Sequence, residues 1–189
     1  MTPIRPEILI AFLHESNLIE GIETDLASYY YDDLDVHQYN SLEAAHHALQ
    51  LAHDPLDLAT VLELHNLQMS NLLDHKFCGK FRNCNVMVGG DICPPPKELK
   101  KLIASFLKKW EKKSLSCLDL HYEFETIHPF VDGNGRTGRL LYLMDKIRRG
   151  EIVRPILDEF EGSGFLRQRK AYYNAIRRYK LTLKFASLA

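Results

Sequence analysis

HPFVDGNGRTGR occupies residues 128–139 and interrupts a chain whose apolar residues otherwise recur at helical spacing. The run Asp132–Gly135 contains two glycines and is unfavourable inside a helix, so it predicts a loop that leads into the next helix. Glycines in such a loop let the backbone adopt positive φ and bring N–H groups close to a ligand. Because helix N-termini and glycine-rich nests bind anions, this stretch predicts a phosphate site.

Four side chains in the same stretch indicate what could happen at that site. Arg136 and Arg139 are three residues apart, so they share a helix face and present two guanidinium forks to a polyphosphate. Asp132 is a hard oxygen ligand that could hold Mg²⁺ on the phosphates, and His128 could accept a proton from an attacking hydroxyl. Each piece alone is also consistent with a surface turn or a solvated helix face, but together they favour an enzyme.

Working outward from this stretch, helical periodicity predicts an all-α fold. Asp54 followed by Pro55 predicts an N-cap and the first residue of a helix, which carries Val61 and His65 on one face. The segments with helical spacing are 8–19, 41–52, 58–72, 99–110, 115–126, 140–147 and 165–179.

One region, residues 80–90, lacks this periodicity. Val86 and Val88 alternate as in a strand, and glycines and the run Pro94–Pro96 bound the segment. This pattern predicts a small β-hairpin or extended flap on the helical body, and a plain surface loop is the alternative.

Length and composition limit the class of protein. The chain has 189 residues, with 46% hydrophobic and 26% charged residues, so it is sized and composed as one globular domain. Its 24 basic and 25 acidic residues nearly cancel, which argues against nucleic acid as the main partner. No apolar stretch is long enough for a membrane span, the N-terminus lacks a signal-peptide pattern, and the four cysteines form no CxxC pair. We therefore expect a cytoplasmic, reduced protein.

The stretch at 128–139 matches every fixed position of HPFx[D/E]GNGRxxR, the signature of the Fic family. The flap region, the proline run and the late segment 163–176 also resemble that family, so the resemblance implies a single Fic domain over 1–189. The implied fold is a helical bundle with a small hairpin flap near the active site. Doc-like kinases of the same fold have a lysine where Gly135 stands, which argues against a phosphotransfer product.

The resemblance implies a protein adenylyltransferase that transfers AMP from ATP to a Ser, Thr or Tyr hydroxyl of a target protein. His128 is then the base, Asp132 holds Mg²⁺, and Arg136 and Arg139 bind the β- and γ-phosphates. The implied phosphate cradle comprises Gly133, Asn134 and Gly135. Tyr172 or Tyr173 is implied to contact adenine. The implied target-docking flap includes Arg82, Val86, Val88 and Gly89.

A second motif lies near the N-terminus, where Ser16–Gly21 reads SNLIEG. It resembles the family's inhibitory motif [S/T]xxxE[G/N], carried by a helical segment at about 5–21. Its residues Ser16 and Glu20 are implied to be inhibitory, with Glu20 paired to Arg139. The alternative is that Glu20 and Gly21 simply form a helix C-terminus.

Two other functions remain open at this point. The same site could remove AMP from a modified protein, with Glu20 positioning a water, or the chain could be a nucleotide-binding regulatory module without turnover. Some relatives use other nucleotide or phosphocholine donors. The chain could also modify itself or form a homodimer.

Overall fold

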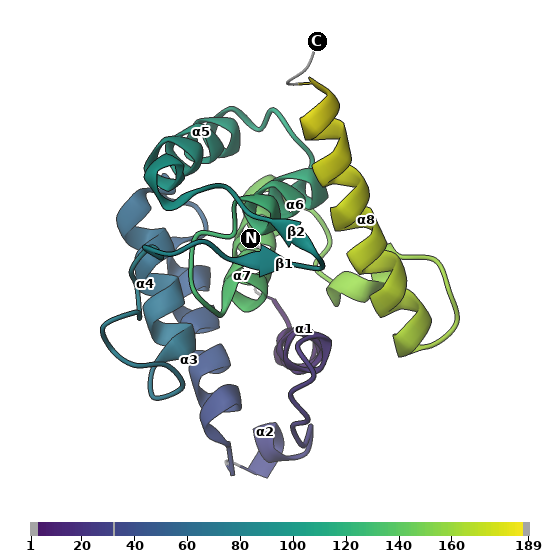
Figure 1. The fold of residues 1–189 in the computed structure, drawn as a ribbon. Helices are drawn as coiled ribbons and strands as arrows, with labels where there is room; N and C mark the ends of the chain where they lie inside the picture. Colours follow the sequence, from purple (N-terminus) through teal and green to yellow (C-terminus); the bar gives the residue numbers. More distant parts are fainter. Residues whose placement is uncertain (1–3, 32, 187–189) are drawn as a thin grey trace.

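The computed structural model describes residues 4–31 and 33–186, with 184–186 as backbone only, and most of the chain is helical (Figure 1). This confirms the predicted all-α class. In chain order the elements are α1 (Pro6–Ile19), α2 (Ser28–Tyr31), α3 (Val36–Leu51), α4 (Leu58–Met69), β1 (Met87–Val88), β2 (Asp91–Ile92), a 3₁₀ turn (Pro96–Glu98), α5 (Leu99–Lys112), α6 (Cys117–Ile127), α7 (Asn134–Arg149), a second 3₁₀ turn (Ile156–Glu159) and α8 (Phe165–Ala186).

Helix α7 lies at the centre of the bundle and is buried along most of its length (Figure 1). One hydrophobic cluster joins it to α4, α5 and α6 and includes Trp110 and Phe130. A second cluster joins it to α1, α3 and α8 and includes Phe12 and Tyr172. Because close-packed cores resist displacement, the N-terminus of α7 is held in one place by both clusters.

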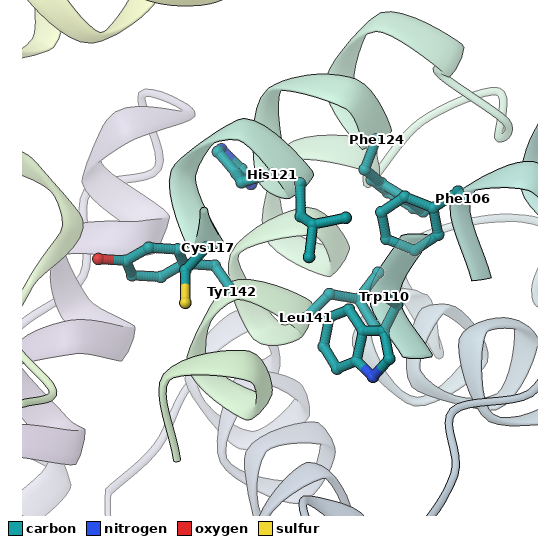
Figure 2. A pocket seen from close by; sticks show the side chains of 8 residues that line it. Phe106, Trp110, Cys117, His121, Phe124, Leu141 and Tyr142 are labelled. Atoms are coloured by element: carbon teal, nitrogen blue, oxygen red, sulfur yellow. The ribbon is translucent and has the colours of Figure 1, made fainter. Parts of the chain in front are cut away.

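The first cluster is tightly filled. Figure 2 shows the gap between α5, α6 and α7, where Phe106, Trp110 and Leu141 face one another. This gap has no space for a water molecule. It is therefore part of the packed core and offers no ligand site.

Two helices begin at residues other than those predicted. Helix α4 begins at Leu58, because the Asp57 carboxylate accepts the Thr60 N–H and caps it; the N-cap predicted at Asp54 is wrong. Helix α3 begins five residues before the predicted 41, because the side chains of Asp35 and Gln38 form a capping box. Both starts are therefore set by capping bonds.

The predicted hairpin is confirmed, with β1 and β2 antiparallel and Met87 opposite Ile92. The Cys93 N–H donates to the Val86 carbonyl at 3.0 Å, so the backbone of Val86 faces β2. In an antiparallel pair the next residue along points its N–H and C=O away from its partner strand. Met87, exposed at its side chain, is thus the residue of β1 whose backbone points outward.

None of the helices within 4–31 and 33–186 has the length and apolar character needed to cross a bilayer.

Candidate active site

The loop at 128–133 connects the end of α6 to the start of α7, and unusual backbone angles shape both of its ends. His128 is the C-cap of α6 with φ 50°, and Gly133 is the N-cap of α7 with φ 73°. A Cβ on Gly133 would lie 2.5 Å from Met69 Sδ, so glycine is required there for space as well as for conformation. The loop thus places His128 beside the N-terminus of α7.

The Asn134 side chain holds the loop from inside. Its Oδ1 accepts the Phe130 N–H at 2.9 Å, and its Nδ2 donates to the Phe130 carbonyl at 3.0 Å. Phe130 itself is fully buried. Both polar atoms of the Asn134 side chain are therefore bonded to the loop backbone, and its role in the phosphate cradle stays a prediction.

His65 on α4 is a structural residue of the site that sequence reasoning placed only on an apolar helix face. Its ring stacks on Phe130 with centroids 3.7 Å apart. Its Nδ1 accepts the Gly79 N–H at 2.9 Å, so Nε2 carries the proton that is donated to the Asp132 carbonyl at 3.0 Å. Burial lowers the pKa of His65 to about 4, which keeps it neutral. It joins the start of the flap region to the loop.

Arg139 is fully buried and bonds directly to the N-terminal motif. Its Nε donates to Ser16 Oγ at 2.8 Å and its Nη2 donates to the Ser16 carbonyl at 2.9 Å. The same Nη2 forms an ion pair with Glu20 Oε1 at 2.6 Å. Residues more than 110 positions apart in the chain thus meet in one charged cluster.

The Glu20 carboxylate lies on the backbone at the N-terminus of α7. A Cβ built on Gly135 would collide with Glu20 Oε1, so glycine is what lets the carboxylate approach. Burial alone would raise the pKa of Glu20, but the guanidinium of Arg139 overrides it and holds this pKa below its ordinary value. An anion therefore already occupies the place where helix N–H groups and arginines favour negative charge.

Glu125 is a second carboxyl group near Arg139, and it belongs to no motif that singles it out. A Cβ on Gly138 would lie 2.6 Å from Glu125 Oε1. Burial raises the pKa of Glu125 to about 8, so this group is mostly protonated at neutral pH. Glu20 is therefore the carboxylate that neutralises Arg139.

Arg136 shares the start of α7 with Arg139, as their spacing predicts. Its Nη1 donates to His37 Nδ1 at 3.2 Å, and its Nη2 donates to Met69 Sδ at 3.2 Å. Both are neutral and weak partners for a guanidinium, since desolvation and the Arg136 charge lower the pKa of His37. Arg136 therefore keeps its charge available for an anion.

The Asp132 carboxylate is exposed at this site. One of its oxygens accepts the Gly133 N–H at 2.6 Å, which leaves the other toward solvent. The described residues contain no group of three or more His, Cys, Asp or Glu side chains that could hold a metal. A single carboxylate fits Mg²⁺, which commonly keeps several waters and binds through one carboxylate and substrate phosphates.

His128 has the protonation state that a base requires. Burial lowers its pKa to about 4, so its ring is neutral at physiological pH. Arg82 Nε donates to the His128 carbonyl at 2.7 Å and so fixes its backbone. His128 is thus a neutral, positioned proton acceptor at the edge of the charged cluster.

Arg82 itself differs from its predicted docking role. Its side chain is buried, and its guanidinium donates to the carbonyls of Cys84 and Pro94 as well as to that of His128. Arg82 therefore joins the two arms of the flap to the loop from within. Val88 and Gly89 remain at the tip of the flap, and Val88 is exposed.

The two tyrosines predicted near adenine have different surroundings. Tyr172 is buried, and its hydroxyl bonds to His121 Nε2 at 2.8 Å and to Arg139 at 3.3 Å, so it is a core residue without access to a base. Tyr173 is 43% exposed and donates to the Ile19 carbonyl at 3.1 Å. Of the pair, only Tyr173 presents a ring at the surface next to Glu20.

Known proteins are similar to this chain in sequence. The Fic/DOC family model matches residues 55–144. "Protein adenylyltransferase Fic" of Drosophila erecta is 39% identical over 93 residues, which cover 46% of this chain and 19% of that protein. The same protein of Drosophila mojavensis is 41% identical over 93 residues and 18% of its length. The chain thus aligns with about a fifth of each of these relatives.

Solved structures show the same fold. A Fic family protein from Desulfovibrio desulfuricans has a TM-score of 0.61 at 28% identity, covering 79% of this chain and 50% of that one. A Fic domain containing signaling protein from Bacteroides thetaiotaomicron has a TM-score of 0.65 at 21% identity, covering 98% and 92%. Fic-1 from C. elegans has a TM-score of 0.63 at 21% identity, covering 97% and 65%.

Proposed function

We propose that this chain, whose residues 55–144 match the Fic/DOC family model, is a protein adenylyltransferase whose resting form is inhibited by Glu20. The observation that carries the proposal is the ion pair between Glu20 and Arg139 on the backbone of Gly135. The site favours anions, and the Glu20 carboxylate of the same chain already lies in it. A nucleotide that binds there must therefore share the site with this inhibitory carboxylate. The direct test is transfer of label from α-labelled ATP to protein.

The proposed reaction requires few groups. His128 takes the proton of a target Ser, Thr or Tyr hydroxyl, the hydroxyl oxygen bonds to the α-phosphorus of ATP, and pyrophosphate leaves. Arg136 and Arg139 bind the phosphates, and the rigid loop keeps the attack in line. Asp132 would hold Mg²⁺, which when bound neutralises phosphate charge.

Loss of the Asp132 carboxylate is expected to remove the Mg²⁺ dependence together with most of the activity. Asp132→Ala and Asp132→Asn should each lower transfer about a hundredfold at a fixed Mg²⁺ concentration. The two variants are compared in a Mg²⁺ titration with α-labelled ATP. Asp132→Asn retains an acceptor for the Gly133 N–H, so it controls for loss of the loop bond. Full activity of Asp132→Asn, or activity of the protein with Asp132 intact that persists in chelator, would contradict the metal assignment.

The outer edge of β1 is the proposed docking site for a target segment in extended conformation, which would add a strand to the hairpin. Met87→Pro deletes the outward N–H at a position where an edge strand tolerates proline. It should lower target labelling about tenfold, because the free energy of roughly one backbone hydrogen bond with its packing corresponds to a change of that size. ATP binding should be unchanged.

Met87→Ala is the matched control, because it removes the side chain and keeps the N–H. Equal losses in Met87→Ala and Met87→Pro would show that the side chain is read instead of the backbone. Loss of ATP binding in Met87→Pro would place the hairpin in the nucleotide site.

A further inference from the structure

Helix α8 carries a stripe of residues on one face, at Arg169, Tyr173, Arg177 and Lys180, spaced four, four and three apart as helix neighbours are. The sequence of α8 contains seven lysine and arginine residues and no aspartate or glutamate. This helix therefore gives the neighbouring surface a strongly positive electrostatic potential. We call these four residues the α8 stripe.

The α8 stripe runs along the candidate site from Glu20 to the tip of the hairpin. At one end, the charge of Arg169 contributes to the lowered pKa of Glu20, and Tyr173 donates to the Ile19 carbonyl. At the other end, a Cβ on Gly89 would lie 3.7 Å from Arg177 Nη2. Figure 1 shows α8 beside the turn between β1 and β2.

Part of this positive charge has no counterpart among the residues whose side chains the structure describes. Lys180 lies 3.7 Å from Asp91 on β2. Within residues 4–31 and 33–183, whose side chains are described, Arg177 forms no ion pair or hydrogen bond, and it is exposed. Among the described residues, a guanidinium thus stands without an anionic partner next to the hairpin turn.

We propose that the protein segment docking along β1 carries acidic side chains next to the hydroxyl that receives AMP, and that Arg177 recognises them. The inference rests on the proposed function. Backbone pairing with β1 accepts almost any sequence, so discrimination among targets must come from side chains beside the hairpin. Those side chains are cationic, and charge complementarity of this kind attracts acidic segments and repels basic ones.

The test uses two fluorescent peptides that are identical except for the residues around a central threonine, which are glutamate in one and lysine in the other. Binding to the Glu20→Gly protein is measured by anisotropy without nucleotide, and labelling is measured with α-labelled ATP. We expect the glutamate peptide to bind about tenfold more tightly at low salt, and the difference to disappear at about 0.5 M salt.

Arg177→Glu in the same background should abolish or reverse this preference. Arg178→Glu is the matched control, because it makes the same charge change at an exposed neighbour that lies by Tyr122 of α6; it should retain the preference. Equal affinity for the two peptides, or equal effects of the two variants, would overturn the inference. If the glutamate peptide is preferred as expected but neither it nor the protein is labelled, the proposed function fails while the acidic preference stands.

Discussion

The Glu20→Gly protein is expected to transfer AMP more than tenfold faster than the parent protein, both to a target and to itself. In the parent protein, the Glu20 carboxylate forms an ion pair with Arg139 Nη2 and lies against the backbone of Gly135. Its negative charge also repels a nucleoside triphosphate at short range. Glycine removes the charge and the bulk together, so ATP can place its α-phosphorus in line. A tenfold gain corresponds to about 1.4 kcal/mol of barrier.

The measurement is labelling with α-labelled ATP at saturating nucleotide, together with ATP affinity. Affinity should change little, because the pose of the nucleotide and not its occupancy limits the rate. Glu20→Asp should be intermediate. Glu23→Gly removes an exposed carboxylate three residues away without touching Arg139, so it should resemble the parent. A Glu20→Gly protein that is no more active than Glu23→Gly would refute inhibition. Loss of an AMP-removing activity in Glu20→Gly would instead make Glu20 a residue of the reverse reaction.

Replacing His128 is the change with the largest expected loss. In the Glu20→Gly background, His128→Ala should lower transfer about 10²–10⁴-fold, the contribution typical of a general base. Because burial holds the pKa of His128 at about 4, the ring is neutral across physiological pH, and transfer should fall only as the medium approaches that value. The phosphates of bound ATP add negative charge nearby and should raise this pKa, which strengthens the base in the complex.

ATP binding and thermal stability of His128→Ala should match those of the His128 protein, and His46→Ala, at an exposed position of α3, should retain full activity. Labelling that survives in His128→Ala would remove His128 from the reaction. Nucleotide binding without labelling in any of these variants would favour a regulatory module.

Motif spacing predicted the local features of this site well. The glycines at 133 and 135, the shared face of Arg136 and Arg139, and the hairpin all follow from rules that relate a few adjacent residues to backbone geometry. The approach of Glu20 to Arg139 was implied by the resemblance of a second motif, because nothing in composition or periodicity connects residues so far apart.

The remaining features depend on tertiary contacts that local patterns do not contain. His65 looks like any polar residue on an apolar face until Gly79 and Asp132 are brought to its two nitrogens. Tyr172 and Tyr173 are adjacent in sequence, and only the packing of α8 determines which of them is buried. The family resemblance implies that Arg82 belongs to the target-docking flap, whereas four backbone carbonyls bind its guanidinium inside the protein.

The contacts of Ser16 with Arg139 allow activation without a displacement of helix α1. Two of the hydrogen bonds of Arg139 go to Ser16 Oγ and to the Ser16 carbonyl, and neither involves the Glu20 side chain. On the proposed function, the resting and active forms then differ by rotation about the side-chain bonds of one residue, which takes picoseconds to nanoseconds when the side chain is exposed. A partner that draws the Glu20 carboxylate aside could therefore switch the enzyme on within a single encounter, and nucleotide phosphate would then have to replace Glu20 as the anion that neutralises the buried Arg139.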